Sequence, residues 1–191
     1  MLYLIIILIM MTIIAVLNIL FNAMFPFYVY IIATIAFTVL VIIIDAIVAS
    51  IIRALPEKHF DYHKKIFNPS PRSLKFYEKI GVKKWKEKVP ELGMFTHFRK
   101  NKIADPKNPE YLKRFILEAC YGVIIHYVSL PLSFIIMLFD IKMYVGESNL
   151  FLTVALPVAS VNAVLIVLPA FILRYNLPKL IRLYEISLKR K

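Results

Sequence analysis

The first 52 residues read MLYLIIILIMMTIIAVLNILFNAMFPFYVYIIATIAFTVLVIIIDAIVASII, and Asp45 is the only charged side chain among them. A helix that spans a bilayer needs roughly 20 mostly apolar residues, so this stretch is long enough for two spans. We therefore predict an integral membrane protein. An ionisable group at membrane depth is costly and marks a candidate functional site, which makes Asp45 the first residue of interest.

Two more long apolar stretches follow later in a chain of 191 residues that is 60% hydrophobic. The four predicted spans cover about residues 2–23, 27–52, 119–140 and 150–172. The first stretch lacks a basic start and a small-residue cleavage site, so we expect it to remain in the mature protein. The predicted fold class is all-α, with four transmembrane helices and a cytoplasmic amphipathic segment between spans two and three.

Positive charge is concentrated in two parts of the chain. Of the 24 Lys and Arg residues, 17 lie between Arg53 and Arg114, and six more lie from Arg174 to Lys191. Cytoplasmic loops carry an excess of Lys and Arg, so a multi-pass protein of the cell membrane with both termini inside is predicted. The predicted regions are a transmembrane hairpin (1–52), a basic cytoplasmic interfacial segment (53–112), and a second hairpin with a basic tail (113–191).

The net charge of +12 raises the question of a nucleic-acid partner. Acidic residues are interleaved in the basic segment and no nucleic-acid-binding motif occurs there, so we predict no such partner and expect contact with anionic membrane lipid. Cys120 is the only cysteine, and His59 and His63 stand in a Pro-flanked loop without enough further ligands. No metal site is predicted. The oligomeric state is left open.

Two short amphipathic helices are expected in the basic segment. In PSPRSLKFYEKIG (69–81), Ser73 is a candidate N-cap and apolar side chains recur at helical spacing. In VKKWKEKV (82–89), Trp85 and two valines share one face, with lysines on the other. That pattern is typical of a helix lying in the headgroup region, where Trp is favoured.

The polar residues predicted at membrane depth are Asp45, Glu118, His126, Asn162 and the run Arg174-Tyr175-Asn176. Glu118 and Arg174 are expected near the inner interface, where they are placed to form a pair. His126 lies about 12 Å deeper than Glu118 along one helix, and Asp45 is expected at a similar depth. A histidine oriented by a carboxylate suits deprotonation of a hydroxyl, and an arginine suits a phosphate or a carboxylate. In the alternative interpretation, these groups satisfy one another and only fix helix packing.

Three stretches occur together in a characteristic order. They are VKKWKEKVPELGMF (82–95), FILEACYGVIIHYVSLPLSF (115–134) and VNAVLIVLPAFILRYNLPKLIRLYEISLKRK (161–191). In order and approximate spacing they resemble the glycosyl-4,4'-diaponeurosporenoate acyltransferases, small membrane enzymes that esterify a sugar hydroxyl of a glycosylated carotenoid. The resemblance covers about residues 68–190 and leaves the first hairpin outside the specific motifs.

The resemblance carries over to individual residues. Those that match the family pattern are Trp85, Lys86, Glu118, His126, Arg174, Tyr175, Asn176 and Pro178, while Lys179 and Tyr127 replace Arg and Trp. The departures are Tyr121 for an Arg, Val123 for a Glu and Leu177 for an Arg. Asp45 is a candidate replacement for the missing carboxylate. The implied site comprises His126, Glu118 and Asp45 as catalytic residues, with Arg174, Tyr175, Asn176, Trp85 and Lys86 binding substrate.

The resemblance implies a membrane acyltransferase of carotenoid or lipid biosynthesis. A fatty acyl group would pass from a cytoplasmic thioester, either acyl-CoA or acyl-carrier protein, to a hydroxyl of a membrane-embedded glycolipid or glycosylated isoprenoid. No further cofactor is implied. Loss of the charges at positions 121, 123 and 177 favours the alternative, a non-catalytic scaffold or lipid-binding protein that retains the fold. A proton pathway through Asp45 and His126 is less favoured, because a single carboxylate in span two provides no evident path across the bilayer.

Overall fold

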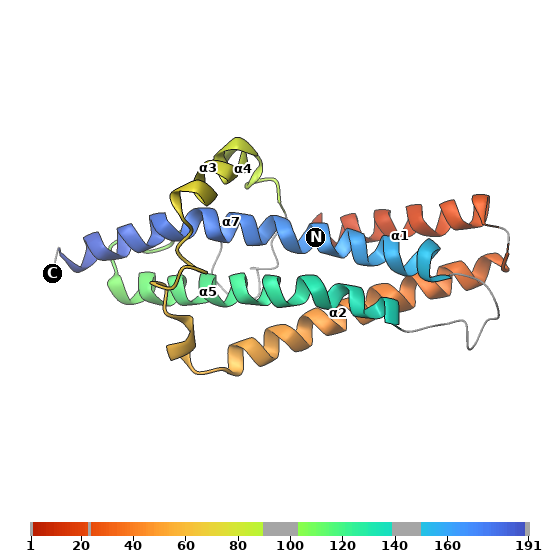
Figure 1. The fold of residues 1–191 in the computed structure, drawn as a ribbon, viewed down its shortest axis with the longest axis horizontal. Helices are drawn as coiled ribbons and strands as arrows, with labels where there is room; N and C mark the ends of the chain where they lie inside the picture. Colours follow the sequence, from red (N-terminus) through yellow and green to blue (C-terminus); the bar gives the residue numbers. More distant parts are fainter. Residues whose placement is uncertain (1, 23, 90–102, 139–149, 190–191) are drawn as a thin grey trace. The chain divides into compact units, whose positions relative to one another are not determined.

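The computed structural model describes residues 2–22, 24–89, 103–138 and 150–189, and this part of the chain contains helices and no β-strand (Figure 1). The long helices are α1 (Leu2–Phe21), α2 (Phe27–Ala54), α5 (Pro109–Leu132) and α7 (Leu156–Leu188). The short ones are η1 (Glu57–Phe60), α3 (Pro71–Lys79), α4 (Val82–Trp85), η3 (Ser133–Leu138) and the π-helix η4 (Phe151–Ala155). The all-α prediction is therefore confirmed for the described residues.

Three stretches of the described chain are long and apolar enough to cross a membrane, namely Phe27–Ala54, Pro109–Ile135 and Thr153–Leu188. The apolar helix Ile5–Phe21 is shorter. By length and composition, three of the four predicted spans are thus supported. The first predicted span (about 2–23), the orientation of the termini and the division at residues 52 and 112 stay predictions. The last helix continues well past its predicted end at residue 172, which proves important for the site.

Local sequence explains where the short helices begin and end. Ser70 caps α3, because its side chain accepts a hydrogen bond from the backbone N–H of Ser73 at 3.3 Å. The predicted cap at Ser73 is wrong, since Pro71 already occupies the first helical position, where a missing N–H costs nothing. Gly81 separates α3 from α4 with φ of 71°, a left-handed conformation that glycine adopts without strain.

The chain forms two compact units, and α2, α5 and α7 each contribute to both. Unit 1 comprises Met1–Ala49 and Val128–Ile166, and unit 2 comprises Ser50–Tyr127 and Val167–Lys191. In unit 1, buried side chains of α1 and α2 pack against η4 and the first turns of α7. The Asn18 amide also donates a hydrogen bond to the Thr153 carbonyl at 2.8 Å, which ties α1 to the irregular π-turn.

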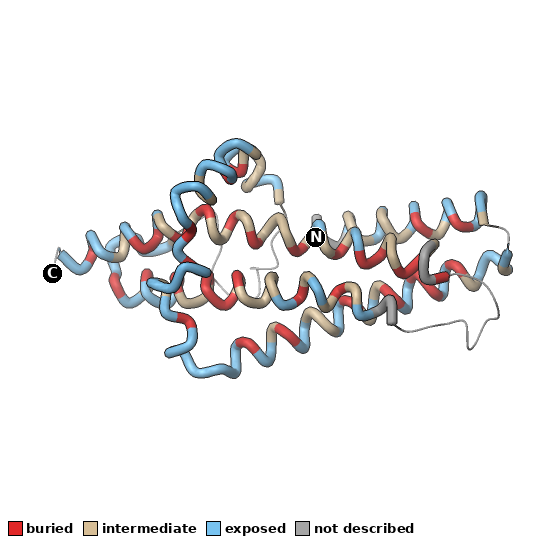
Figure 2. The backbone as a smooth tube through the Cα atoms, in the orientation of Figure 1, coloured by how far each residue is buried: buried red, intermediate tan, exposed pale blue. Residues whose placement is uncertain are grey.

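The outer faces of α1 and α2 remain apolar and exposed in unit 1. Phe21 and Leu20 are 81% and 67% exposed, and Ile32 is 62% exposed. Figure 2 shows buried and exposed residues alternating along these helices, as expected for elements with one face packed on the core. An apolar outer surface of this extent is stable when hydrocarbon surrounds it, which agrees with a membrane protein.

In unit 2, the short helices α3 and α4 pack against α7. The shared core contains Tyr77, Val82, Ile172 and Tyr175, with Leu74, Ile80, Trp85, Val89 and Phe171 around it. The apolar face predicted to lie in the headgroup region is therefore covered by protein. A location in the headgroup region stays a prediction. The apolar face meets α7, which stays helical beyond residue 172 and offers a partner surface that the periodicity of 82–89 does not reveal.

Gly122 allows α5 to approach α7 closely in unit 2. A Cβ atom at this position would lie 2.7 Å from Leu173 Cδ1, so the space left by the missing side chain is used by α7. We expect Gly122→Ala to be nearly neutral, because the better helix propensity of Ala offsets a rotation of the flexible Leu173 side chain. Gly122→Leu should lower the free energy of unfolding by about 1–3 kcal/mol. Denaturant unfolding in detergent tests this, and Gly122→Leu,Leu173→Ala should recover most of the loss if the clash is the cause.

Candidate functional site

Arg174, near the middle of α7, is the centre of the polar site in unit 2. Its Nη1 donates hydrogen bonds to the hydroxyl oxygens of Tyr127 on α5, at 2.9 Å, and Tyr77 on α3, at 3.1 Å. The guanidinium also lies over the Tyr127 ring, with Cζ 5.8 Å from the centroid. Its Nε is buried and has no hydrogen-bond partner, and no carboxylate of the described residues forms an ion pair with it. The cation is thus held by neutral groups and retains an unused donor.

Tyr77 is an uncharged hydrogen-bond acceptor for this arginine. Only 3% of the residue is exposed, and burial is the main reason why the pKa of its phenol is raised above the ordinary value of 10.0. The positive charge of Arg174 acts in the opposite direction but does not overcome the burial. The phenol therefore keeps its proton at neutral pH, where it accepts from Arg174 through oxygen without neutralising its charge.

The VKKWK stretch meets the Arg-Tyr-Asn stretch through Lys86 and Asn176. Lys86 Nζ donates a hydrogen bond to Asn176 Oδ1 at 3.4 Å. Trp85 packs on the same core as Tyr175, and its indole N–H donates to the Ile80 carbonyl at 2.9 Å. Parts of the three sequence motifs, distant along the chain, therefore converge in unit 2.

Tyr175, predicted to bind substrate, is 5% exposed and is part of the unit 2 core. Lys179 lies one turn later on α7, with its Nζ 4.0 Å from the Tyr175 ring centroid, a cation–π contact. Tyr175 therefore positions α7 against α4, and its predicted contact with substrate stays a prediction.

Glu118 forms a network with two arginines rather than with Arg174. Its Oε2 lies 2.5 Å from Arg53 Nη1 and its Oε1 lies 2.8 Å from Arg114 Nη2, while Arg114 also reaches Glu57 at 3.4 Å. The predicted Glu118–Arg174 pair is therefore wrong. Arg174 contacts Tyr127, nine residues after Glu118 and about 13 Å further along α5, because α7 continues past the level at which the span was expected to end.

The Glu118 network predicts a measurable contribution to stability. Glu118→Gln removes the negative charge that faces Arg53 and Arg114, and we expect the free energy of unfolding to fall by about 1–2 kcal/mol. The loss stays below that of a fully buried pair because both arginines are partly exposed and can turn to water. Denaturant unfolding in detergent measures it, with Glu78→Gln, at an exposed residue outside this network, as the matched control. Equal stabilities for the two variants would contradict a structural role for the Glu118 network.

His126 is half-buried on α5, directly before the arginine-binding Tyr127. It lies two turns of helix from Glu118, so a direct hydrogen bond between these two side chains is excluded by the helix rise. His126 as a general base, and Glu118 as a catalytic residue, stay predictions. The described residues contain no group of three His, Cys, Asp or Glu side chains arranged to hold a metal ion.

Asp45 is found in unit 1, where its partner is Asn162. The Asn162 amide donates to Asp45 Oδ2 at 3.3 Å and to Ser133 Oγ at 2.9 Å. Asp45 therefore takes part in a polar contact between α2 and α7 within unit 1. Its predicted pairing with His126, which belongs to unit 2, stays a prediction.

The three positions that depart from the family pattern are all buried in unit 2. Val123 and Leu177 are fully enclosed, and Tyr121 is buried against Phe60, with ring centroids 4.5 Å apart. Arg53 lies over the Tyr121 ring, 5.7 Å from its centroid. Uncharged side chains therefore occupy these three positions in buried surroundings.

Several polar contacts of the site have no clear signal in the sequence. Tyr77 was assigned only to an apolar helix face, although a tyrosine on such a face has a polar tip that needs a partner. The sequence analysis counted Arg53 and Arg114 only as part of the excess of positive charge that predicts a cytoplasmic segment. Tyr127 was identified only as a replacement for Trp, yet its hydroxyl oxygen accepts the shorter of the two hydrogen bonds that Arg174 donates.

Comparison with known proteins agrees with this convergence. A search of curated proteins and a search of solved structures find no match to this chain. The model of one protein family, glycosyl-4,4'-diaponeurosporenoate acyltransferase, matches residues 57–186, which include the first two motifs, most of the third and every side chain around Arg174. The match covers more than half of the chain. The protein therefore belongs to the glycosyl-4,4'-diaponeurosporenoate acyltransferase family.

Proposed function

We propose that this protein is a membrane O-acyltransferase that moves a fatty acyl group from a cytoplasmic thioester to a hydroxyl of a membrane-embedded glycolipid or glycosylated isoprenoid. Family membership supports the reaction class. The observation that carries the proposal is the environment of Arg174, a half-buried cation with two tyrosine hydroxyls, no described counter-carboxylate and an unused Nε–H. A cation held in this way is suited to an anionic or carbonyl oxygen of a substrate.

In the proposed reaction, His126 takes the proton of the acceptor hydroxyl. The hydroxyl oxygen then attacks the thioester carbonyl carbon, the new C–O bond forms and the C–S bond breaks. The thiolate leaves and receives the proton from His126, so the products are an ester and a free thiol. A positioned general base of this kind contributes typically about 10²–10⁴-fold to a rate.

The donor is proposed to bind to α3 and α4, whose apolar faces pack on α7 and whose basic side chains point outward. The exposed cations of this surface are Arg72, Lys75, Lys79, Lys83, Lys84 and Lys88. Either the phosphates of acyl-CoA or the acidic surface of an acyl-carrier protein would be attracted to it. Lys86, Asn176 and Arg174 form the inner part of the same region, with Trp85 and Tyr175 supporting it.

The proposed reaction requires a cytoplasmic location for unit 2. The Lys and Arg placement supports the N-in, C-in arrangement in the cell membrane, because the basic segment would face the compartment that contains thioesters. The acceptor hydroxyl would approach from the membrane, where the apolar outer faces of the spans meet lipid.

A non-catalytic scaffold is the second candidate, and one observation favours it. Tyr121, Val123 and Leu177 replace charged residues of the family pattern and are buried in packed surroundings. A protein that kept the fold and bound lipid without transferring an acyl group would tolerate these changes.

Incubation of the purified protein with radiolabelled acyl-CoA or acyl-carrier protein and a membrane lipid extract separates the two candidates. The enzyme produces a labelled ester that is sensitive to mild base, at a rate proportional to protein concentration. Lipid that copurifies with the protein, with no labelled ester from either donor, would overturn the proposed transfer and support the scaffold.

A further inference from the structure

Unit 1 contains a polar cluster that the proposed reaction does not use. It comprises Asp45 on α2, Ser129 on α5, Ser133 at the start of η3 and Asn162 on α7. Asn162 is 7% exposed, and Ser129 and Ser133 are buried still more completely. Buried polar groups within candidate membrane spans are costly unless they are paired, so a cluster of four residues calls for a specific explanation.

The hydrogen bonds of this cluster determine the orientation of the Asn162 amide. Its Nδ2 donates to Asp45 Oδ2 and to Ser133 Oγ, so both amide hydrogens have acceptors. A carboxylate oxygen only accepts unless it is protonated, and the reversed amide would place two acceptors together. Asp45 therefore acts as a positioning residue that leaves Asn162 Oδ1 as an acceptor at the pocket, whereas the second Asp45 oxygen, Oδ1, is buried without a partner among the described residues and does not line the pocket. No donor of the described residues forms a hydrogen bond with Asn162 Oδ1.

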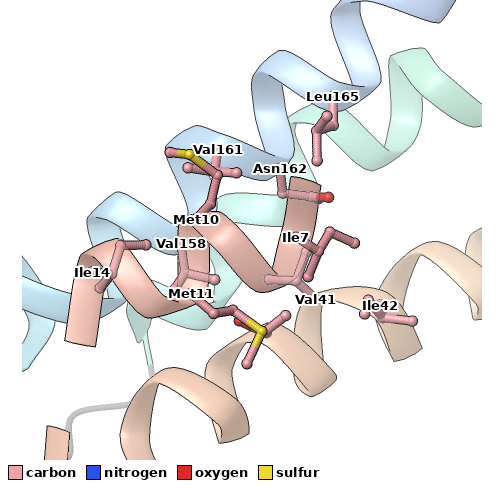
Figure 3. A pocket seen from close by; sticks show the side chains of 11 residues that line it. Ile7, Met10, Met11, Ile14, Val41, Ile42, Val158, Val161, Asn162 and Leu165 are labelled. Carbon is pink, nitrogen blue, oxygen red and sulfur yellow. The ribbon is translucent and has the colours of Figure 1, made fainter. Parts of the chain in front are cut away.

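Asn162 also lines an apolar pocket between α1, α2 and α7, all within unit 1 (Figure 3). Apart from Thr38 and Asn162 the lining is aliphatic or thioether, and it includes Ile7, Met10, Met11, Val41, Val158 and Leu165. Figure 3 shows the Asn162 side chain among these apolar side chains, with its oxygen visible at the tip. Unbranched Met side chains adapt readily to an occupant of irregular shape.

The pocket thus combines an apolar wall with a hydrogen-bond acceptor whose orientation is fixed. Binding sites for small apolar molecules have this composition, in which a few placed polar groups determine how the ligand is oriented. An anion would meet no cation here, and a sugar headgroup would leave most of its hydroxyls unpaired against the apolar wall. The complementary ligand is an apolar chain that carries one hydrogen-bond donor.

We propose that this pocket, with about 30 Å³ of free space, receives the hydroxyl end of a membrane-embedded long-chain alcohol, with the first carbons of the chain against the Met and aliphatic side chains and the hydroxyl donated to Asn162 Oδ1. The pocket lies between the apolar helix α1 and the two candidate membrane helices α2 and α7, so its supply of ligands is the bilayer rather than water. The inference is independent of acyl transfer, because it concerns residues of unit 1 and requires binding only.

Photolabelling of the full chain in native membranes tests the inference. The probes are hexadecanol and hexadecane, each with a diazirine at the same chain carbon, and labelled peptides are identified by mass spectrometry. One hydrogen bond to the hydroxyl should give about three- to tenfold more labelling of pocket peptides by the alcohol than by the alkane. Equal labelling by the two probes would overturn the proposal, because it would show only partition into the membrane.

Two variants locate the binding determinant. Asn162→Leu keeps the approximate volume and removes the acceptor, and labelling by the alcohol should fall to the level of the alkane. Met10→Trp fills the pocket, keeps all four residues of the polar cluster in the sequence and should reduce labelling by both probes. Leu17→Trp places the same large ring on the exposed part of α1 and should leave the labelling unchanged. Wild-type labelling in both Asn162→Leu and Met10→Trp would refute the site even if one of the two variants folds poorly.

Discussion

Replacement of His126 with alanine should lower the rate of acyl transfer by about 10²–10⁴-fold, the range expected when a positioned general base is removed. Without the imidazole, the acceptor hydroxyl must lose its proton to water during its attack on the thioester. The binding of donor and acceptor should change little, so the loss is expected in kcat rather than in the KM for either substrate.

Labelled ester formation at saturating donor measures this effect. His63→Ala is the matched control, because His63 is exposed and lies outside the three motifs, and its rate should equal that of the wild type. A His126→Ala rate within twofold of the wild type would exclude His126 as the base. Loss of activity in both variants would instead indicate a general effect on folding, which the unfolding transition in detergent would reveal.

Replacement of Arg174 with methionine should have the second largest effect. We expect kcat/KM for the donor to fall by about 10–100-fold, because hydrogen bonds to charged groups contribute about 1.5–3 kcal/mol. The change also leaves the hydroxyls of Tyr77 and Tyr127 without their shared donor, so the unfolding transition should move to lower denaturant concentration. Arg174→Lys should restore little, since an ammonium lacks the planar arrangement of donors that serves two tyrosines and a substrate oxygen together.

Initial rates over a range of donor concentrations separate binding from chemistry in these variants. Arg182→Met removes an exposed cation from the same helix and should leave kcat/KM for the donor nearly unchanged. Tyr127→Phe keeps the ring beneath the guanidinium and removes only its hydroxyl, so a smaller loss is expected than in Arg174→Met. An unchanged KM and kcat in Arg174→Met would refute a role for Arg174 in donor binding.

The sequence was sufficient to predict the helical, membrane-embedded class. Uninterrupted apolar runs have one stable arrangement in a bilayer, in which a helix satisfies every backbone group internally. The helix start at Phe27 also agrees with the predicted start of the second span. The end of α7 differs from the prediction, because the polar stretch after residue 172 looks like the end of a span. In the structure this stretch remains helical, and apolar side chains of α7 pack against α3 and α4.

The sequence predicted which residues form the candidate site, but not which of them contact one another. The motifs named Trp85, Lys86 and Arg174, and the structure brings these motifs together in unit 2. The ion pair expected between Glu118 and Arg174 does not form, because a shift of about two helical turns separates their levels along α5. A contact between two helices depends on how far one is shifted along its axis relative to the other. The periodicity of a single helix does not contain this information.

The sequence by itself determined the class of the protein, the apolar spans, the basic segment and the residues that mark its family. Composition and local periodicity are sufficient for these properties, because they depend on each segment and its solvent. Tertiary structure alone decided that two tyrosines hold Arg174, that two arginines hold Glu118 and that Asp45 orients Asn162 toward an apolar pocket. Hydrogen bonds between side chains act over about 3 Å, and only the packing of whole helices brings residues so distant in sequence within that range.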